Sequence, residues 1–220
     1  MGKARTYMCF FLLILISIVN TMQRSIIAYM FMYATEDEEK NSDEHRHMYY
    51  ISEDITDFTR ENFSYIAGDA YSIIYAFLVL ILGSATDLMN RKYVLCGSCF
   101  GWCMTVYLSG FATSWNQLFF YRVLMAIFNA FSGPCSYSLI TDWIPAEGRT
   151  LAYAFYAVGV QFGGPLSHLN EGIIDWLGWR AAFQFSALMG FVVLAMALLV
   201  FDEPERGRFD INNSVVVNPD

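Results

Sequence analysis

The sequence predicts an all-α membrane protein that folds as one six-helix bundle. Hydrophobic residues make up 56% of the chain, the mean hydropathy is +0.38, and no low-complexity tract divides the chain into separate domains. A helix needs about 20 apolar residues to cross the hydrocarbon of a bilayer. Runs of this kind lie at about residues 7–33, 64–86, 93–112, 116–140, 150–171 and 181–201. The bundle therefore occupies residues 1–208, and residues 209–220 form a polar tail.

The first and fourth runs each contain a single full charge, Arg24 and Arg122 respectively. A charge at membrane depth costs several kcal/mol, so it persists only where it faces a protein interior or a water-filled cavity. These two arginines therefore mark the part of the bundle where a function is expected. The first run is also too long for a signal peptide, so we expect it to be a retained helix.

Lysine and arginine residues predict the orientation of the bundle. If the helices alternate, seven of these residues fall on one side and four on the other, which places both termini and the polar tail in the cytoplasm. The first group is Lys3, Arg5, Arg91, Lys92, Arg149, Arg206 and Arg208, and the second is Lys40, Arg46, Arg60 and Arg180.

The second helix is preceded by a loop at 34–63 that supplies much of the net charge of −8. A block of like charges usually stays solvated, so a plain acidic loop on the non-cytoplasmic side is one interpretation. A vestibule that attracts cations is the other. Two alternating histidines, His45 and His47, are too weak a pattern to predict a metal site.

The third helix contains Cys96, Cys99 and Cys103 on one face. A Cys-x-x-Cys pair can indicate zinc or redox chemistry, but no histidine or second pair lies near this one in the sequence. We expect these cysteines to act as small packing residues. Gly97 and Gly101 favour close helix contact in the same segment.

The segment between the second and third helices carries a recognisable pattern. It reads Gly-Ser-Ala-Thr-Asp-Leu-Met-Asn-Arg-Lys over residues 83–92, and it resembles the signature loop of the major facilitator superfamily of transporters. Gly83, Asp87, Arg91 and Lys92 match that signature. Asn90 stands where the family has glycine, and Asn tolerates a left-handed conformation. The resemblance implies that this loop helps to lock the transporter in one state.

Residues 175–180 before the sixth helix repeat this pattern of an aspartate, a turn residue and a base. The repetition suggests two inverted three-helix repeats, the arrangement within each half of such transporters. Three stretches resemble the spinster-like branch of the superfamily: one in helix one, one across helices four and five, and one after helix six. Their residues are 20–24, then Arg122, Leu124, Ala130, Leu139, Ile140, Asp142, Glu147 and Arg149, and finally 203–207. In helix five, Gly159, Gly163, Gly164 and Pro165 predict a weak point suited to bending.

The resemblance also predicts a substrate site. Arg24, Asp69 and Arg122 lie at similar membrane depths and are expected to form one positively charged layer, because two arginines face a single carboxylate. The residues expected to bind substrate are Arg24, Asp69, Arg122, Asn129 and Gln161. Where the branch has carboxylates this chain has Gln23 and Asn129, which weakens the case for proton coupling. Alternatively, the arginines snorkel to the interface or pair with loop acids.

The expected function is that of a transporter half. The family needs two six-helix halves, so the chain is expected to require a second half, a second copy or other membrane subunits, besides the lipid bilayer. Its solute is expected to be anionic and organic or lipid-like. The alternative is a non-transporting structural subunit that keeps the bundle. No nucleophile–base pair, metal cluster or phosphate loop indicates an enzyme or a cofactor.

Overall fold

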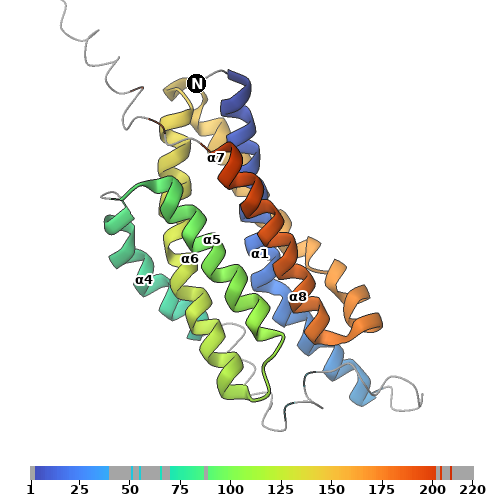
Figure 1. The fold of residues 1–220 in the computed structure, drawn as a ribbon. Coiled ribbons are helices and arrows are strands. Elements are labelled where there is room, and N and C mark those ends of the chain that lie inside the picture. Colours follow the sequence, from blue (N-terminus) through green and yellow to red (C-terminus); the bar gives the residue numbers. More distant parts are fainter. Residues whose placement is uncertain are drawn as a thin grey trace, which may run out of the picture.

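The computed structural model describes residues 3–39, 70–86 and 89–201, together with the single residues 51, 55, 65, 204 and 209. This part of the chain forms long helices packed side by side (Figure 1). In order they are α1 (Lys3–Glu39), α4 (Ala70–Thr86), α5 (Arg91–Ser109), α6 (Trp115–Trp143), α7 (Ala146–Leu166) and α8 (Leu169–Val200). Each corresponds to one of the apolar runs, so the predicted all-α bundle is confirmed.

The helix boundaries differ from the predicted runs at two places. α1 extends to Glu39 and so includes the first residues of the segment expected to be an acidic loop; most of that segment lies outside the described residues. α7 ends at Leu166, and residues 169–171, expected in the fifth run, already belong to α8. Among the described helices, three stretches are long and apolar enough to cross a membrane: Ala4–Ala28, Trp115–Trp143 and Trp176–Val200.

The two turn residues of the repeated pattern have different backbones. Gly178 has φ 84° and ψ 167°, which breaks α8 into a short segment and a long one. Asn90 has φ −69° and ψ 114°, and its side chain accepts a hydrogen bond from the Tyr93 backbone at 3.2 Å. The expectation of a left-handed Asn90 is therefore wrong. Asn90 caps α5, and a cap of this kind needs an extended backbone.

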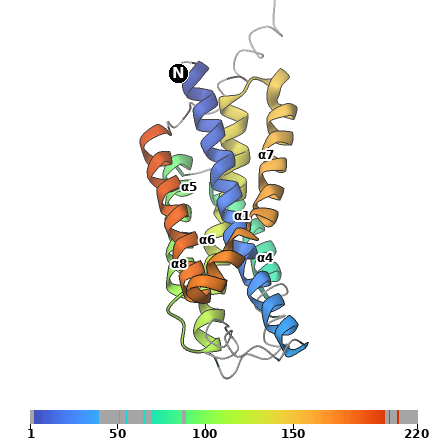
Figure 2. The same ribbon diagram turned by 90° about the vertical axis from the view of Figure 1, so that its right-hand side faces the viewer.

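The packing of the helices shows the internal repeat. α1 packs against α7 and α8, α6 packs against α4 and α5, and α5 packs against α8. Exchanging the first three helices for the last three maps these contacts onto each other, with a smaller additional contact between α6 and α7. The N-terminal end of α1 and the C-terminal end of α8 lie at the same end of the bundle (Figures 1 and 2). This arrangement fits two inverted three-helix repeats.

Glycines allow the closest helix contacts. A Cβ on Gly163 would be 2.4 Å from the carbonyl oxygen of Ile18, and one on Gly159 would be 2.5 Å from the side chain of Ile14. These two glycines are therefore the face of α7 that packs on α1, and α7 continues as one helix through Pro165. Their spacing is that of the small-residue motif of membrane helices.

Of the two glycines expected to make close helix contacts in the third predicted helix, only one does so. Gly101 packs against the ring of Phe128, where an added Cβ would be 2.3 Å away, but Gly97 has nothing within 4 Å. Gly97 therefore makes no close helix contact within the described structure, contrary to expectation, because it lies on the exposed side of α5. Cys96, Cys99 and Cys103 are free and buried, as packing residues would be.

Candidate substrate pocket between α1, α4, α6 and α7

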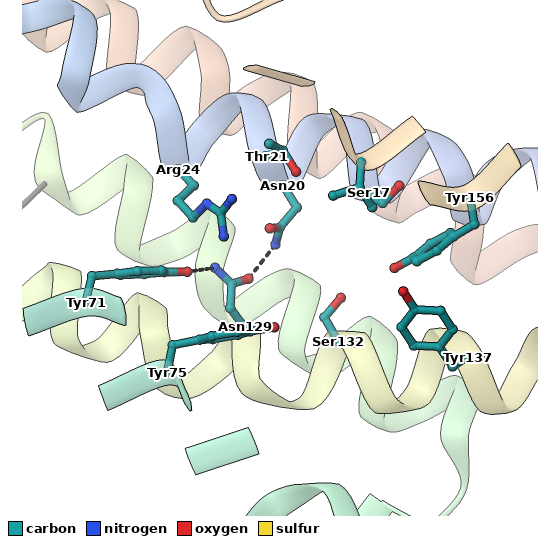
Figure 3. Close-up of a pocket in the computed structure, with 12 residues that line it drawn as sticks. Ser17, Asn20, Thr21, Arg24, Tyr71, Tyr75, Asn129, Ser132, Tyr137 and Tyr156 are labelled. Atoms are coloured by element: carbon teal, nitrogen blue, oxygen red, sulfur yellow. Dashed lines mark hydrogen bonds between the residues drawn. The ribbon is translucent and has the colours of Figure 1, made fainter. Parts of the chain in front are cut away.

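A pocket with a volume of about 160 Å³ lies between four helices (Figure 3). α1 and α6 supply most of its lining, while α4 and α7 close the sides. Nearly all the lining side chains carry a hydroxyl, an amide or a guanidinium group. The lining residues are Ser17, Asn20, Thr21, Arg24, Tyr71, Tyr75, Asn129, Ser132, Gly133, Tyr137, Tyr156 and Val160.

Two asparagines and a tyrosine join three of these helices. The side-chain amide of Asn20 in α1 donates a hydrogen bond to Oδ1 of Asn129 in α6. Asn129 in turn donates from Nδ2 to the hydroxyl of Tyr71 in α4, at 2.8 Å (Figure 3). Asn129 is buried, so these bonds satisfy polar groups that would otherwise cost free energy away from water. This amide bridge holds one wall of the pocket in place.

Arg24 gives the pocket its charge. Its side chain is exposed and points into the space between α1 and α6 (Figure 3). Among the lining residues that the structure describes, it is the only ionised group, and no carboxylate accompanies it. The pocket therefore has a positive potential, and a guanidinium can hold a carboxylate or phosphate through two parallel hydrogen bonds.

Tyrosine rings form the remaining walls. Tyr71 and Tyr75 are stacked with their planes 6° apart and their centroids separated by 6.1 Å. Towards the other end of the pocket, Tyr137 meets Tyr156 edge to face, with centroids 5.4 Å apart. Tyrosine offers both an apolar ring face and a hydroxyl, so these walls can contact the body of a solute and also hydrogen-bond it.

Arg122 lies behind the pocket rather than in it. It is only 4% exposed, and its Nη1 donates to the backbone carbonyl of Arg24 at 3.2 Å. Its guanidinium carbon lies 5.9 Å from the centre of the Phe183 ring, and Nε and Nη2 have no hydrogen-bond partner within the described structure. The two arginines are neighbours, but only Arg24 lines the pocket. Asp69, the expected third member of the layer, lies outside the described residues.

The remaining residues that the sequence singled out for the substrate site do not all line the pocket. Asn129 lines the pocket, whereas Gln161 is exposed and is not among the lining residues. Gln23 is 0% exposed and donates from Nε2 to the carbonyl oxygen of Ser186 at 2.8 Å. It also fills the space beside Gly190, where an added Cβ would be 2.6 Å from Nε2. Gln23 is thus a packing residue between α1 and α8.

The segment expected to act as a gating loop is described in part. Arg91, at the start of α5, forms a buried ion pair with Asp142 near the end of α6 and also donates to the Ser138 carbonyl at 3.1 Å. Lys92 lies 6.0 Å from the centre of the Tyr93 ring.

Gly83 and Asp87 are the other two residues expected in the gating loop. A Cβ on Gly83 would be 3.7 Å from Pro134, an ordinary contact, so that position tolerates a side chain. A glycine in this signature is expected to let two helices approach closely, and the described structure shows no such close approach at Gly83. Asp87 lies outside the described residues.

Sequence reasoning missed most of the pocket. Ser17, Asn20 and Thr21 share one face of α1 with Arg24, because residues three, four and seven apart align on a helix. The tyrosines were overlooked because an aromatic residue in an apolar helix usually indicates core packing. A search for hydroxyl and amide groups at helical spacing would have found the α1 face.

The chain matches the Major Facilitator Superfamily over residues 9–215. It belongs to that superfamily. Superfamily proteins are transporters rather than enzymes, and membership makes this chain an integral membrane protein with the six-helix fold of one half.

Individual relatives are more distant. Over 147 residues the chain is 30% identical to the multidrug efflux pump LfrA of Mycolicibacterium smegmatis, covering 64% of this chain and 29% of that protein. Over 152 residues it is 25% identical to the hexuronate transporter of Escherichia coli K12, covering 67% and 34%. The chain thus spans about a third of the length of these relatives.

A solved structure has the same fold over nearly the whole chain. The chain superimposes with a TM-score of 0.76 on a bacterial homolog of the human lysosomal transporter Spinster, in an inward-facing and unoccupied conformation. The match covers 94% of this chain and 45% of the other at 22% identity. At that identity the likeness shows the fold alone, which is the six-helix half that the sequence predicted.

Proposed function

We propose that this chain forms one half of a secondary transporter that moves an anionic organic solute across a membrane by alternating access. The observation that carries the proposal is Arg24, the only ionised group on the lining of the described pocket. A charge held at this depth in a membrane helix is costly unless it serves a cavity or a solute. The name of the hexuronate transporter, a relative that carries an anion, agrees with this choice.

The proposal requires a second half. Alternating access needs two bundles that rock around a shared site, and the pocket-bearing face of α1, α4, α6 and α7 is the surface that such a half would cover. Left against lipid, its hydroxyl and amide groups would cost several kcal/mol each where they lack partners. A second copy or other membrane subunits are the alternative occupants of this face.

The loop between α4 and α5 has a role in this proposal as well. Arg91 and Asp142 tie the start of α5 to the end of α6 at the mouth of the bundle. Together with Gly83, Asp87 and Lys92, they would form the lock that holds one state of the transport cycle. Breaking that lock would favour the opposite state without removing the solute site.

Transport of labelled anions into proteoliposomes that contain this chain together with the half or second copy that co-purifies with it tests the proposal. Arg24→Gln should reduce uptake at low solute concentration by about tenfold or more, since a hydrogen bond to a charged group contributes about 1.5–3 kcal/mol. Arg24→Lys should retain part of it, because the charge remains while the two-pronged geometry is lost. Arg5→Gln, an exposed arginine near the start of α1, is the matched control and should transport normally.

A non-transporting structural subunit is the second candidate. The observation that favours it is Gln23, which is fully buried and bonded to α8 and so takes no part in the pocket. This candidate expects the protein to be folded and assembled with partners while Arg24→Gln changes no flux. An Arg24-dependent uptake would exclude it.

A further inference from the structure

The lining of the pocket restricts the class of solute beyond its charge. Of the lining side chains, five carry a small hydroxyl or an amide and four are tyrosines, whereas Val160 is the single aliphatic one in the described pocket. An acyl chain needs a continuous aliphatic wall, because it forms no hydrogen bonds and leaves polar lining groups unpaired. The described pocket offers no such wall.

The volume of the pocket also favours a compact solute over an acyl chain. About 160 Å³ is close to the volume of an engineered protein cavity that holds benzene, so this face of the bundle receives a group of about one six-membered ring. From Ser17 to Arg24 the lining of α1 extends for seven residues, or about 10 Å. That length fits one ring with a charged group at its end.

The arrangement of groups suggests how such a ring would be held. Asn20 of α1 and Asn129 of α6 are bonded to each other, and beside this pair Ser17 and Thr21 line the α1 wall while Ser132 lines the α6 wall, which places hydrogen-bonding groups on both walls (Figure 3). The stacked rings of Tyr71 and Tyr75 stand at the side. A hydroxylated ring has polar edges and apolar C–H faces, and it needs this combination of walls.

We propose that the solute is a sugar acid: a compact, polyhydroxylated ring whose carboxylate binds Arg24 and whose hydroxyls bond to the amide and hydroxyl groups of α1 and α6. This inference rests on the proposed function and narrows it, because it selects a sugar acid over the lipid-like anions that the sequence left open. Arg24 and the amide bridge form the carboxylate end of the site, and Tyr137 and Tyr156 form the other end.

Binding of tritiated D-glucuronate to the purified protein in nanodiscs tests the inference. Four unlabelled competitors separate the chemical features: D-galacturonate keeps the acid and the hydroxyls, D-glucose lacks the acid, benzoate lacks the hydroxyls, and a lysophosphatidate is a lipid-like anion. We expect galacturonate to compete within about tenfold of glucuronate. Benzoate should be weaker by roughly 100-fold or more, because a site built to hydrogen-bond hydroxyls rejects analogues without them.

Two variants test which group of the solute each side chain contacts. Ser132→Ala should weaken glucuronate binding but leave benzoate binding unchanged, and Arg24→Gln should weaken both. Arg5→Gln serves as the control, and an unchanged melting temperature excludes misfolding as the cause.

The outcomes separate this inference from the proposed function. If the lysophosphatidate or benzoate displaces glucuronate at equal or lower concentration and Arg24→Gln abolishes that effect, the sugar-acid inference is wrong while the anion site stands. If glucose competes as well as glucuronate, or no anion binds in a manner that depends on Arg24, both are wrong.

Discussion

Asn20 of α1 donates its side-chain hydrogen bond to Asn129 of α6, and this bond joins the two inverted repeats beside the pocket. α1 and α6 are the first helices of their repeats, so the pair lies close to the pseudo-symmetry axis that relates them. Two amides can satisfy each other there without introducing a charge. Because Asn129 also bonds to Tyr71, a change at this pair should alter the pocket from three sides.

A double-mutant cycle on Asn20→Ala and Asn129→Ala should show a coupling energy of about 0.6–1.7 kcal/mol, the range measured for hydrogen bonds between membrane helices. Unfolding in detergent, followed by tryptophan fluorescence, supplies the four free energies. The control cycle pairs Asn20→Ala with Asn116→Ala, an exposed residue at the start of α6, and its effects should simply add. Additive effects in the first cycle would contradict the bridge.

Gly163→Ala should destabilise the bundle by about 1–3 kcal/mol, because the new methyl group would overlap the backbone of α1 at Ile18. Gly164→Ala is the adjacent control: an added Cβ would meet no atom within 4 Å in the described structure, so the change should be neutral or slightly stabilising in a helix. Melting temperatures in the same detergent measure both. Equal effects of the two changes would show that α7 does not pack on α1 through Gly163.

Gly178→Ala should cost about 1–3 kcal/mol, since its backbone angles lie in a region that is open almost only to glycine. Gly172→Ala lies in the same helix and should be tolerated, because an added Cβ there would meet no described atom within 4 Å. Thermal unfolding again distinguishes them. If Gly178→Ala is as stable as Gly172→Ala, the break in α8 does not need a glycine.

Asp142→Asn should destabilise the protein by up to about 3–5 kcal/mol, because it removes the carboxylate of a buried ion pair with Arg91. Glu147→Gln removes a carboxylate from the exposed first turn of α7 and should have little effect. Denaturant unfolding measures the difference. A mild effect at Asp142 would mean that other groups compensate Arg91.

Labelling of introduced cysteines tests the predicted orientation. The five native cysteines are all buried, so an impermeant maleimide should react only with a new exposed site. Thr113→Cys, between α5 and α6, should be labelled from the non-cytoplasmic side of intact cells. Ala146→Cys, at the exposed start of α7, should react only after the cells are opened. The reverse pattern would overturn the placement of both termini in the cytoplasm.

The number and nature of the helices could be predicted from residues close together in the chain. Apolar length is a local property, and a run of about 20 such residues indicates a spanning helix wherever it occurs. The turn at Gly178 and the signature around Arg91 could also be recognised in the sequence, because short motifs depend only on neighbouring residues. For the same reason Arg24 was recognised: a lone charge stands out in an apolar run.

The positions of side chains around the bundle depended on how each helix is rotated against its neighbours. Arg24 and Arg122 look alike in sequence, yet one enters the pocket and the other is buried against Phe183. That difference arises because close contacts such as Gly163 on Ile18 set the rotation and approach of the helices. The same packing places Gln23 in the core and brings Tyr71 from α4 to Asn129 of α6, 58 residues away in sequence.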